Sequence, residues 1–119
     1  MISKNLKDEE YTIRKHSLKI NISCLIDAIN KSEVNYELDE FKIEELSDLI
    51  VSDGIDEKYI ININNERRDE PIIVTVIFNE IYIIDGNHRF IKRINDGFKV
   101  FKILYISPEE LKPFIEFLQ

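Results

Sequence analysis

The stretch that decides the fold runs from Ile81 to Phe98 and reads Ile-Tyr-Ile-Ile-Asp-Gly-Asn-His-Arg-Phe-Ile-Lys-Arg-Ile-Asn-Asp-Gly-Phe. Its first four residues are branched or aromatic, in a run that is too short for a helix and typical of a buried strand. After the central turn the spacing of apolar residues becomes helical, and Gly97 stands where a helix ends. The pattern predicts a strand that enters a helix through a glycine turn. The apolar face expected for this helix comprises Phe90, Ile91 and Ile94.

The turn itself, residues 85–89, combines an acid, a glycine, an amide, an imidazole and a guanidinium. A helix that starts after a glycine turn has unpaired backbone N–H groups, and the helix dipole adds positive potential at the same place. Arg89 adds a planar donor that suits phosphate or carboxylate. An anion-binding site is one interpretation of this turn. An ordinary Asp-Gly turn followed by a solvated helix start is the other.

The strand, the Asp85-Gly86-x-His88-Arg89 turn and the helix, glycine and strand that follow resemble the ParB/sulfiredoxin fold family, over approximately residues 18–107. Members of that family bind nucleotide phosphates at this turn. They include CTP-dependent ParB partition proteins, ATP-dependent sulfiredoxins, free serine kinases and ParB-like nucleases. The resemblance implies an α/β (α+β) fold, with a small mixed sheet and flanking helices. A nucleotide such as ATP or CTP, together with Mg²⁺, would then be the ligand.

The same resemblance assigns roles within the turn. Gly86, Asn87, His88 and Arg89 would bind the nucleotide phosphates, and Asp85 and His88 are the candidate catalytic residues. Asp85 would hold the turn, bind a metal-bound water or orient a hydroxyl. A transferring phosphoryl group needs positioning and charge neutralisation more than covalent help, so these roles are chemically reasonable.

Members of the family differ in how well they fit this sequence. Sulfiredoxin activity is disfavoured because Asn87 occupies the position of the catalytic cysteine. Partition proteins add a DNA-reading domain and a dimerisation tail, for which a chain ending at Gln119 has no room. Serine kinases place a catalytic glutamate before their first long helix, and Glu37 is nearest to that position, although Glu33, Asp39 and Glu40 are close to it. Nuclease activity fits least, because phosphodiester hydrolysis usually needs several converging metal ligands.

The bulk composition limits the classes of function. The length of 119 residues suits a single domain, and the single cysteine, Cys24, cannot form an internal disulfide, so we expect a cytoplasmic protein. No apolar run is long enough to span a membrane, and the N-terminus does not resemble a signal peptide. A net charge of −7 disfavours a dedicated nucleic-acid-binding protein.

The charge is unevenly distributed, with acids crowded between residues 33 and 57. The motif region is locally basic, through His88, Arg89, Lys92, Arg93, Lys99 and Lys102. This distribution favours a small anionic ligand. Two alternatives stay open: a non-enzymatic interaction module, such as an inhibitor or antitoxin, that uses its acidic surface to bind a protein partner, and DNA binding through the basic motif face.

The remaining elements are predicted from local patterns. Residues 1–10 are expected to fray, 11–22 to form one strand or a bent pair, and 23–30 a helix with Leu25, Ile26 and Ile29 inward and Cys24 in the core or at its boundary. An amphipathic helix is expected over 39–54, with Phe41, Ile43, Leu46, Leu49 and Ile50 as its stripe. Residues 56–70 are interpreted as an insertion, comprising a strand at 59–63 and a charged loop at 64–70. This loop is either solvated or brings Arg67 and Arg68 to a phosphate. Beyond it we expect a hairpin of 71–78 and 81–84 that turns at Asn79-Glu80, a strand at 100–106 and a closing helix at 108–119.

Overall fold

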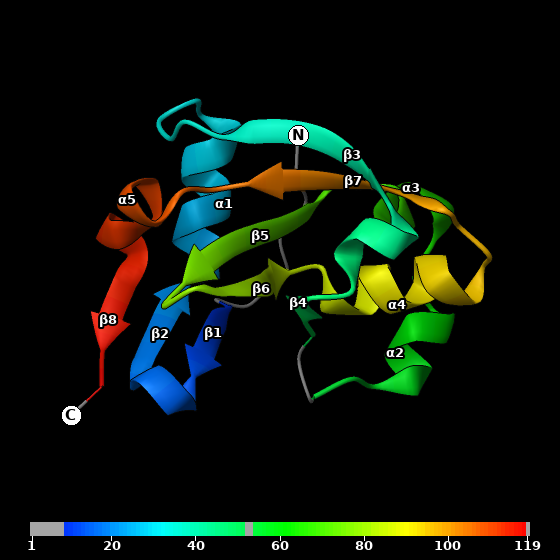
Figure 1. Ribbon diagram of the computed structural model, residues 1–119, viewed down its shortest axis with the longest axis horizontal. Helices are drawn as coiled ribbons and strands as arrows, with labels where there is room; N and C mark the ends of the chain where they lie inside the picture. The colour runs from blue at the N-terminus through cyan, green and yellow to red at the C-terminus, as the bar shows by residue number, and fades with distance from the viewer. Residues whose placement is uncertain (1–8, 52–53, 119) are drawn as a thin grey trace.

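A β-hairpin of Ile72–Ile77 (β5) and Glu80–Asp85 (β6) forms the centre of a five-stranded mixed sheet in the computed structural model, which describes residues 9–51 and 54–118 (Figure 1). The strand order is β3-β7-β5-β6-β4. β5 pairs antiparallel with β6 and parallel with β7, so the centre of the sheet is mixed. The other three strands are Glu37–Lys42 (β3) and Leu49–Ile50 (β4) at the two edges, and Val100–Tyr105 (β7) between β3 and β5.

A second, three-stranded antiparallel sheet has the order β1-β2-β8 and comprises Glu10–Ile13 (β1), Leu18–Asn21 (β2) and Ile115–Phe117 (β8). The described α-helices are Ile22–Asn30 (α1), Glu57–Ile61 (α2), Asn65–Arg68 (α3), Asn87–Asn95 (α4) and Pro108–Leu111 (α5). Short 3-10 segments occupy Arg14–His16, Ile43–Leu46 and Lys112–Phe114. None of the described helices is long and apolar enough to cross a membrane.

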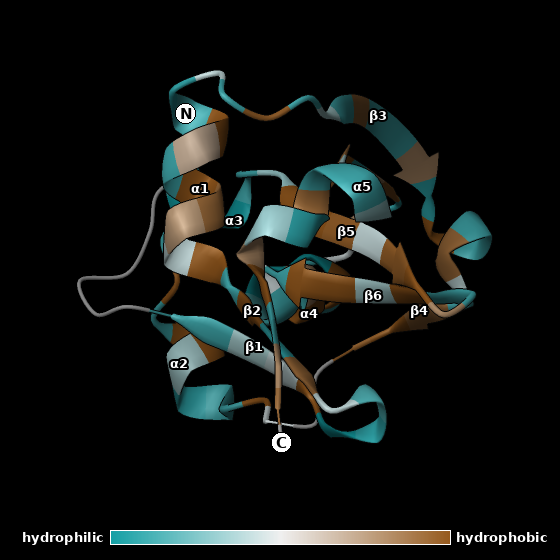
Figure 2. Cartoon of the chain, turned by 90° about the vertical axis from the view of Figure 1, so that its left-hand side faces the viewer, coloured by the Kyte–Doolittle hydropathy of each residue, from teal (hydrophilic) through white to brown (hydrophobic). Residues whose placement is uncertain are grey.

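Hydrophobic cores cover both faces of the five-stranded sheet. Alternate residues of each strand point to opposite faces, so Ile73 and Ile84 join one core whereas Ile72 and Ile83 join the other. The first core packs against α1 and the three-stranded sheet, and the second packs against Phe90 of α4. Figure 2 shows α1 at the left of the view, beside the strands β5, β6 and β4 at its centre and right. The double coverage explains why β5 and β6 are almost continuously apolar.

The expected fold class, α+β with a mixed sheet and flanking helices, is confirmed. So are the bent pair of strands before α1, the central hairpin, the strand–glycine–helix unit and the strand β7. Leu25, Ile26 and Ile29 are buried as expected, and Asn21 caps α1. Gly97 follows α4 with a φ of +85°, and the amides of Gly97 and Phe98 bond back to the carbonyls of Ile94 and Arg93, as in a Schellman motif.

The amphipathic helix expected over 39–54 is wrong. Residues 37–42 form the edge strand β3, whose partner β7 lies about sixty residues later in the chain, followed by a 3-10 turn and the short strand β4. Most of the predicted apolar stripe is nevertheless half-buried against the second core, and Ile50 packs against the first. The spacing correctly identified which residues contact the core, but strand pairing determined the backbone conformation.

Several other local predictions are also wrong. Residues 57–61 are helical where a strand was expected, and the expected loop at 64–70 contains α3. The closing helix is limited to Pro108–Leu111 and the 3-10 segment Lys112–Phe114, because residues 115–117 pair with β2. The hairpin turns at Phe78 and Asn79, both with positive φ, one residue earlier than predicted. Cys24 is exposed. Of the segment expected to fray, residues 1–8 lie outside the described part, whereas Glu10 begins β1.

Candidate functional site

The turn between β6 and α4 depends on Gly86. This residue has a φ of +94° and precedes the first residue of α4. A Cβ atom at this position would lie 2.8 Å from Nη2 of Arg89 and 2.8 Å from Cγ2 of Ile72, both closer than van der Waals contact allows. Only glycine therefore combines this backbone conformation with the close approach of Arg89.

The first turn of α4 differs from that of the other described α-helices. The other four each have a side chain that accepts a hydrogen bond from a first-turn amide, and these capping residues are Asn21, Asp56, Asn64 and Ser107. The N-cap of α4 is Gly86, which has no side chain that could make this bond. The positive end of α4 therefore lacks the N-cap side chain that the other four helices have, which favours an anion at this place.

A pocket of about 260 Å³ lies at this helix end. The turn lines it with Asp85, Gly86, Asn87, His88 and Arg89. Segments distant in sequence line the rest, with Glu9, Gly54, Asp56, Tyr59 and Arg67. The structure thus brings together the five residues of the predicted motif and adds others that the motif did not indicate.

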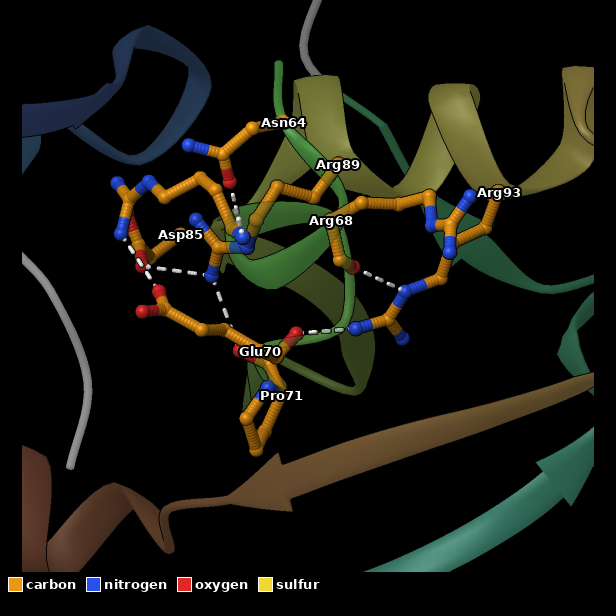
Figure 3. Close-up of polar contacts among 8 residues, drawn as sticks. Asn64, Arg68, Glu70, Pro71, Asp85, Arg89 and Arg93 are labelled. Carbon is orange, nitrogen blue, oxygen red and sulfur yellow. Dashed lines mark hydrogen bonds and ion pairs between the residues drawn. The ribbon is translucent and has the colours of Figure 1, made fainter.

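Arg89 is almost completely buried and joins three parts of the site (Figure 3). Its Nη2 donates to Oδ2 of Asp85 at 3.2 Å and to the backbone carbonyl of Pro71 at 2.9 Å. Its Nε is also buried and has no hydrogen-bond partner among the described residues. A buried guanidinium N–H without an acceptor is costly, so this atom is a candidate donor to an added anion.

His88 is half-buried beside the start of α2. Its Nε2 accepts a hydrogen bond from the backbone N–H of Asp56 at 3.0 Å, and its ring packs edge-on against Tyr59 at 4.8 Å between centroids. Burial lowers the pKa of His88, and the nearby Asp56 carboxylate opposes this shift. The acceptor role of Nε2 requires the tautomer that carries its proton on Nδ1. His88 can therefore offer a phosphate oxygen the Nδ1–H group.

Asn87 contributes to the site mainly through its backbone. Its side chain is buried, and Nδ2 donates to the carbonyl of Ile83 at 2.9 Å. This hydrogen bond connects the first residue of α4 to the last part of β6. One of the two N–H donors of this side-chain amide is therefore used inside the protein, and the phosphate-binding role of Asn87 stays a prediction.

Glu9 is a pocket residue that the sequence did not indicate. Its backbone N–H donates to Oγ of Ser23 at 2.7 Å, and its carbonyl accepts from Ile22, so the start of α1 fixes its position. Burial, together with the negative charge of Asp85, raises the pKa of Glu9 despite the opposing charges of Arg67 and Arg89. No local pattern could have found it, because 75 residues separate positions 9 and 85 and the contact is purely tertiary.

Glu37, the candidate catalytic glutamate, does not join this pocket. It is exposed on β3, pairs in register with Tyr105 and lines a different groove on the sheet. Its assignment depended on a long helix after residue 39, and that helix is absent. The structure places Glu9, rather than Glu37, beside the motif.

Residues 64–71 are held against α4 by hydrogen bonds to their backbone carbonyls (Figure 3). Arg93, one turn after Arg89, is buried and donates from Nε to the carbonyl of Arg68 at 2.6 Å and from Nη2 to the carbonyl of Glu70. Burial, with a smaller effect of the Arg89 charge, lowers the pKa of Arg93 to about 10. This segment is therefore packed against the domain rather than a freely solvated loop.

These contacts also change the interpretation of the basic motif region. Arg89 and Arg93 face the protein interior, and Arg68 bonds to Asp69 and Asp96. The basic face expected to meet DNA consequently lacks its two central arginines.

The residues of the pocket do not form a ready Mg²⁺ site. Within the described ranges, no three His, Cys, Asp or Glu side chains gather closely enough to hold a metal ion. Asp85 is already paired with Arg89, and Asp56 caps α2 through Oδ1.

A search of protein-family models, of curated proteins and of solved structures finds no match to the chain.

Proposed function

We propose that the pocket at the start of α4 binds a phosphate group of a small ligand, with a nucleotide such as ATP or CTP as the favoured class. The observation that carries the proposal is the combination of a helix start without a side-chain cap and the buried, unpartnered Nε of Arg89 at its edge. Helix N-termini and guanidinium groups both bind phosphate oxygens in proteins.

Each pocket residue has a role in this proposal. The first backbone amides of α4 and the guanidinium groups of Arg67 and Arg89 would receive the phosphate oxygens, and His88 would add its Nδ1–H. Glu9, whose pKa is raised, could donate a hydrogen bond when protonated. Phosphate affinity should therefore increase as the pH falls through the pKa of Glu9.

Space beside the pocket supports a ligand larger than free phosphate. A second hollow of about 720 Å³ shares Gly54 with the first and is lined by Tyr11, Tyr82 and Ile50, among others. A ligand anchored by its phosphate at α4 would have this adjoining space for its sugar and base. The resemblance of the Asp85–Arg89 turn to ParB and sulfiredoxin proteins also favours a nucleotide.

Phosphotransfer or a nucleotide switch would use the same residues. Asp85 and His88 remain the catalytic candidates at the turn. No protein-bound Mg²⁺ is part of this proposal, because the described residues of the pocket offer no preformed set of metal ligands.

Calorimetric titration with ATP, ADP, CTP, GTP and inorganic phosphate, each with and without Mg²⁺, tests the proposal. Arg67→Gln and His88→Ala should each weaken binding of the preferred ligand about tenfold, the effect of losing one charge-assisted hydrogen bond. Lys112→Gln, an exposed position away from the pocket, is the control for charge. Circular dichroism should show that all three variants are folded. Absence of binding for every phosphate compound, or equal affinity in all variants, would contradict the proposal.

A further inference from the structure

We propose that a groove on the second-core face of the five-stranded sheet is a docking site for a basic, amphipathic segment of another protein. The groove has a volume of about 320 Å³ and lies apart from the phosphate pocket, with which it shares no lining residue. The proposal is therefore independent of the function assigned to α4.

The floor of the groove is apolar. It is formed by neighbouring strands, with Val76 opposite Ile81 on β6 and Val74 beside Tyr105 on β7. Val76, Ile81 and Tyr105 remain half-exposed, because α4 packs over a different part of this face, where Phe90 contacts Phe101. An apolar hollow of this kind can take a large aliphatic or aromatic side chain.

The rim of the groove is acidic. Glu37 and Asp39 project to this face from β3, and Glu45 and Asp48 come from the segment that follows. All four are exposed, and within the described part of the chain none of them pairs with a lysine or an arginine. Their described hydrogen bonds are local, from the amide of Glu40 to Asp39 and from the amide of Lys42 to Glu45.

This combination of an apolar floor and an acidic rim selects the partner. Lysine or arginine residues on both sides of an apolar anchor would meet the four carboxylates while the anchor fills the groove. Nucleic acid and anionic membrane surfaces would be repelled. A second copy of the chain is also disfavoured, because each copy carries a net charge of −7 and an identical rim.

The other face of β3 does not offer the same arrangement. Leu38 and Glu40 alternate with the groove residues and point to the opposite side, where Leu38 is exposed. None of the residues that line the groove belongs to α1, which packs in the first core on the opposite face of the sheet.

A nuclear magnetic resonance titration tests the proposal. The probe is the synthetic peptide Lys-Leu-Lys-Lys-Leu-Leu-Lys-Lys-Leu-Lys, and the protein is uniformly ¹⁵N-labelled. Amide shifts are expected to concentrate on β3, on residues 45–49 and near Val76, Ile81 and Tyr105. Peptides with Glu in place of Lys, or Ser in place of Leu, should not produce them. Shifts scattered over the whole acidic surface would overturn the proposal.

Matched variants separate the rim from general charge. The double variant Glu37→Gln/Asp48→Asn should weaken peptide binding about tenfold, as expected for the loss of two exposed ion pairs. Glu66→Gln/Glu109→Gln changes the net charge equally at exposed positions outside the groove and should bind like the wild type. Equal weakening in both doubles would overturn the proposal, as would the same shifts on addition of spermine alone. Shifts that instead follow protein concentration would assign the groove to self-association and would also overturn it.

Discussion

Asp85 and Arg89, four positions apart in the chain, form a buried ion pair with Nη2 of Arg89 3.2 Å from Oδ2 of Asp85. The two side chains are only 8% and 4% exposed, so neither charge can be solvated by water if the other is removed. The pair spans the end of β6 and the first turn of α4, and it thereby fixes the geometry of the candidate phosphate pocket.

Removing one member of this pair should destabilise the fold strongly. We expect Asp85→Asn to lower the free energy of unfolding by about 3–5 kcal/mol, because it leaves a buried guanidinium without its counter-charge. The double variant Asp85→Asn/Arg89→Met should lose less than the sum of the two single variants. Urea denaturation measures all three. Asp96→Asn, which affects more exposed ion pairs with Arg68 and Lys92, should cost less than about 1 kcal/mol. Equal losses for Asp85→Asn and Asp96→Asn would refute the importance of the buried pair.

The two glycines that flank α4 should respond differently to alanine. Gly97→Ala introduces backbone strain only, because no atom lies within 4 Å of the added Cβ, and should cost about 1 kcal/mol. Gly86→Ala adds contacts with Arg89 and Ile72 that are too close, and should cost about 2–4 kcal/mol. Thermal and urea unfolding of both variants provide the comparison. A Gly86 variant as stable as its Gly97 counterpart would show that the turn can relax.

Arg93 should control the stability of the segment that contains α3. Arg93→Met removes the two donors to the carbonyls of Arg68 and Glu70, and we expect amide hydrogen exchange over residues 67–70 to accelerate at least about tenfold. Lys92→Met, at the neighbouring helix position, tests for a general effect on α4 and should leave that exchange nearly unchanged. If exchange accelerates uniformly along the chain, the change is global and the segment is not specifically held by Arg93.

Glu80 should make stability depend on pH in the acid range. Hydrogen bonds from Lys15, His16 and Tyr82 lower the pKa of Glu80 from 4.5 to about 2. A carboxylate whose pKa is lower in the folded state stabilises the fold above its unfolded pKa. That contribution is lost as the pH falls from about 4.5 to about 2. Melting temperatures of the wild type should therefore fall more steeply over this interval than those of Glu80→Gln. Parallel curves for the two proteins would contradict this role.

Elements with a strong local signal were predictable from the sequence. The hairpin, the glycine turn and α4 follow one another in the chain, and each is specified by residues a few positions apart. The buried face of α4 was not fully predictable. Arg89 and Arg93 are buried with Phe90, whereas Ile94 is exposed, because polar donors on this face serve the backbone carbonyls of residues 68–71.

Elements that depend on distant partners were mispredicted. β3 carries a helical spacing of apolar residues, but pairing with β7 overrides it. The last strand likewise interrupts an expected helix because β2 provides an edge for it. The same limit applies to the site: Glu9 and Arg67 reach the pocket only through tertiary packing, whereas residues 85–89 are contiguous and visible as a motif.

Arg89 and Arg93 hold residues 64–71 by donating hydrogen bonds to main-chain carbonyl oxygens, which every amino acid possesses. These hydrogen bonds therefore do not depend on which side chains are present at positions 68, 70 and 71. Sequence drift at these three positions could remodel the surface of the segment while its path over α4 stays the same. Mutational scanning should consequently find broad tolerance there and very little at the two arginines.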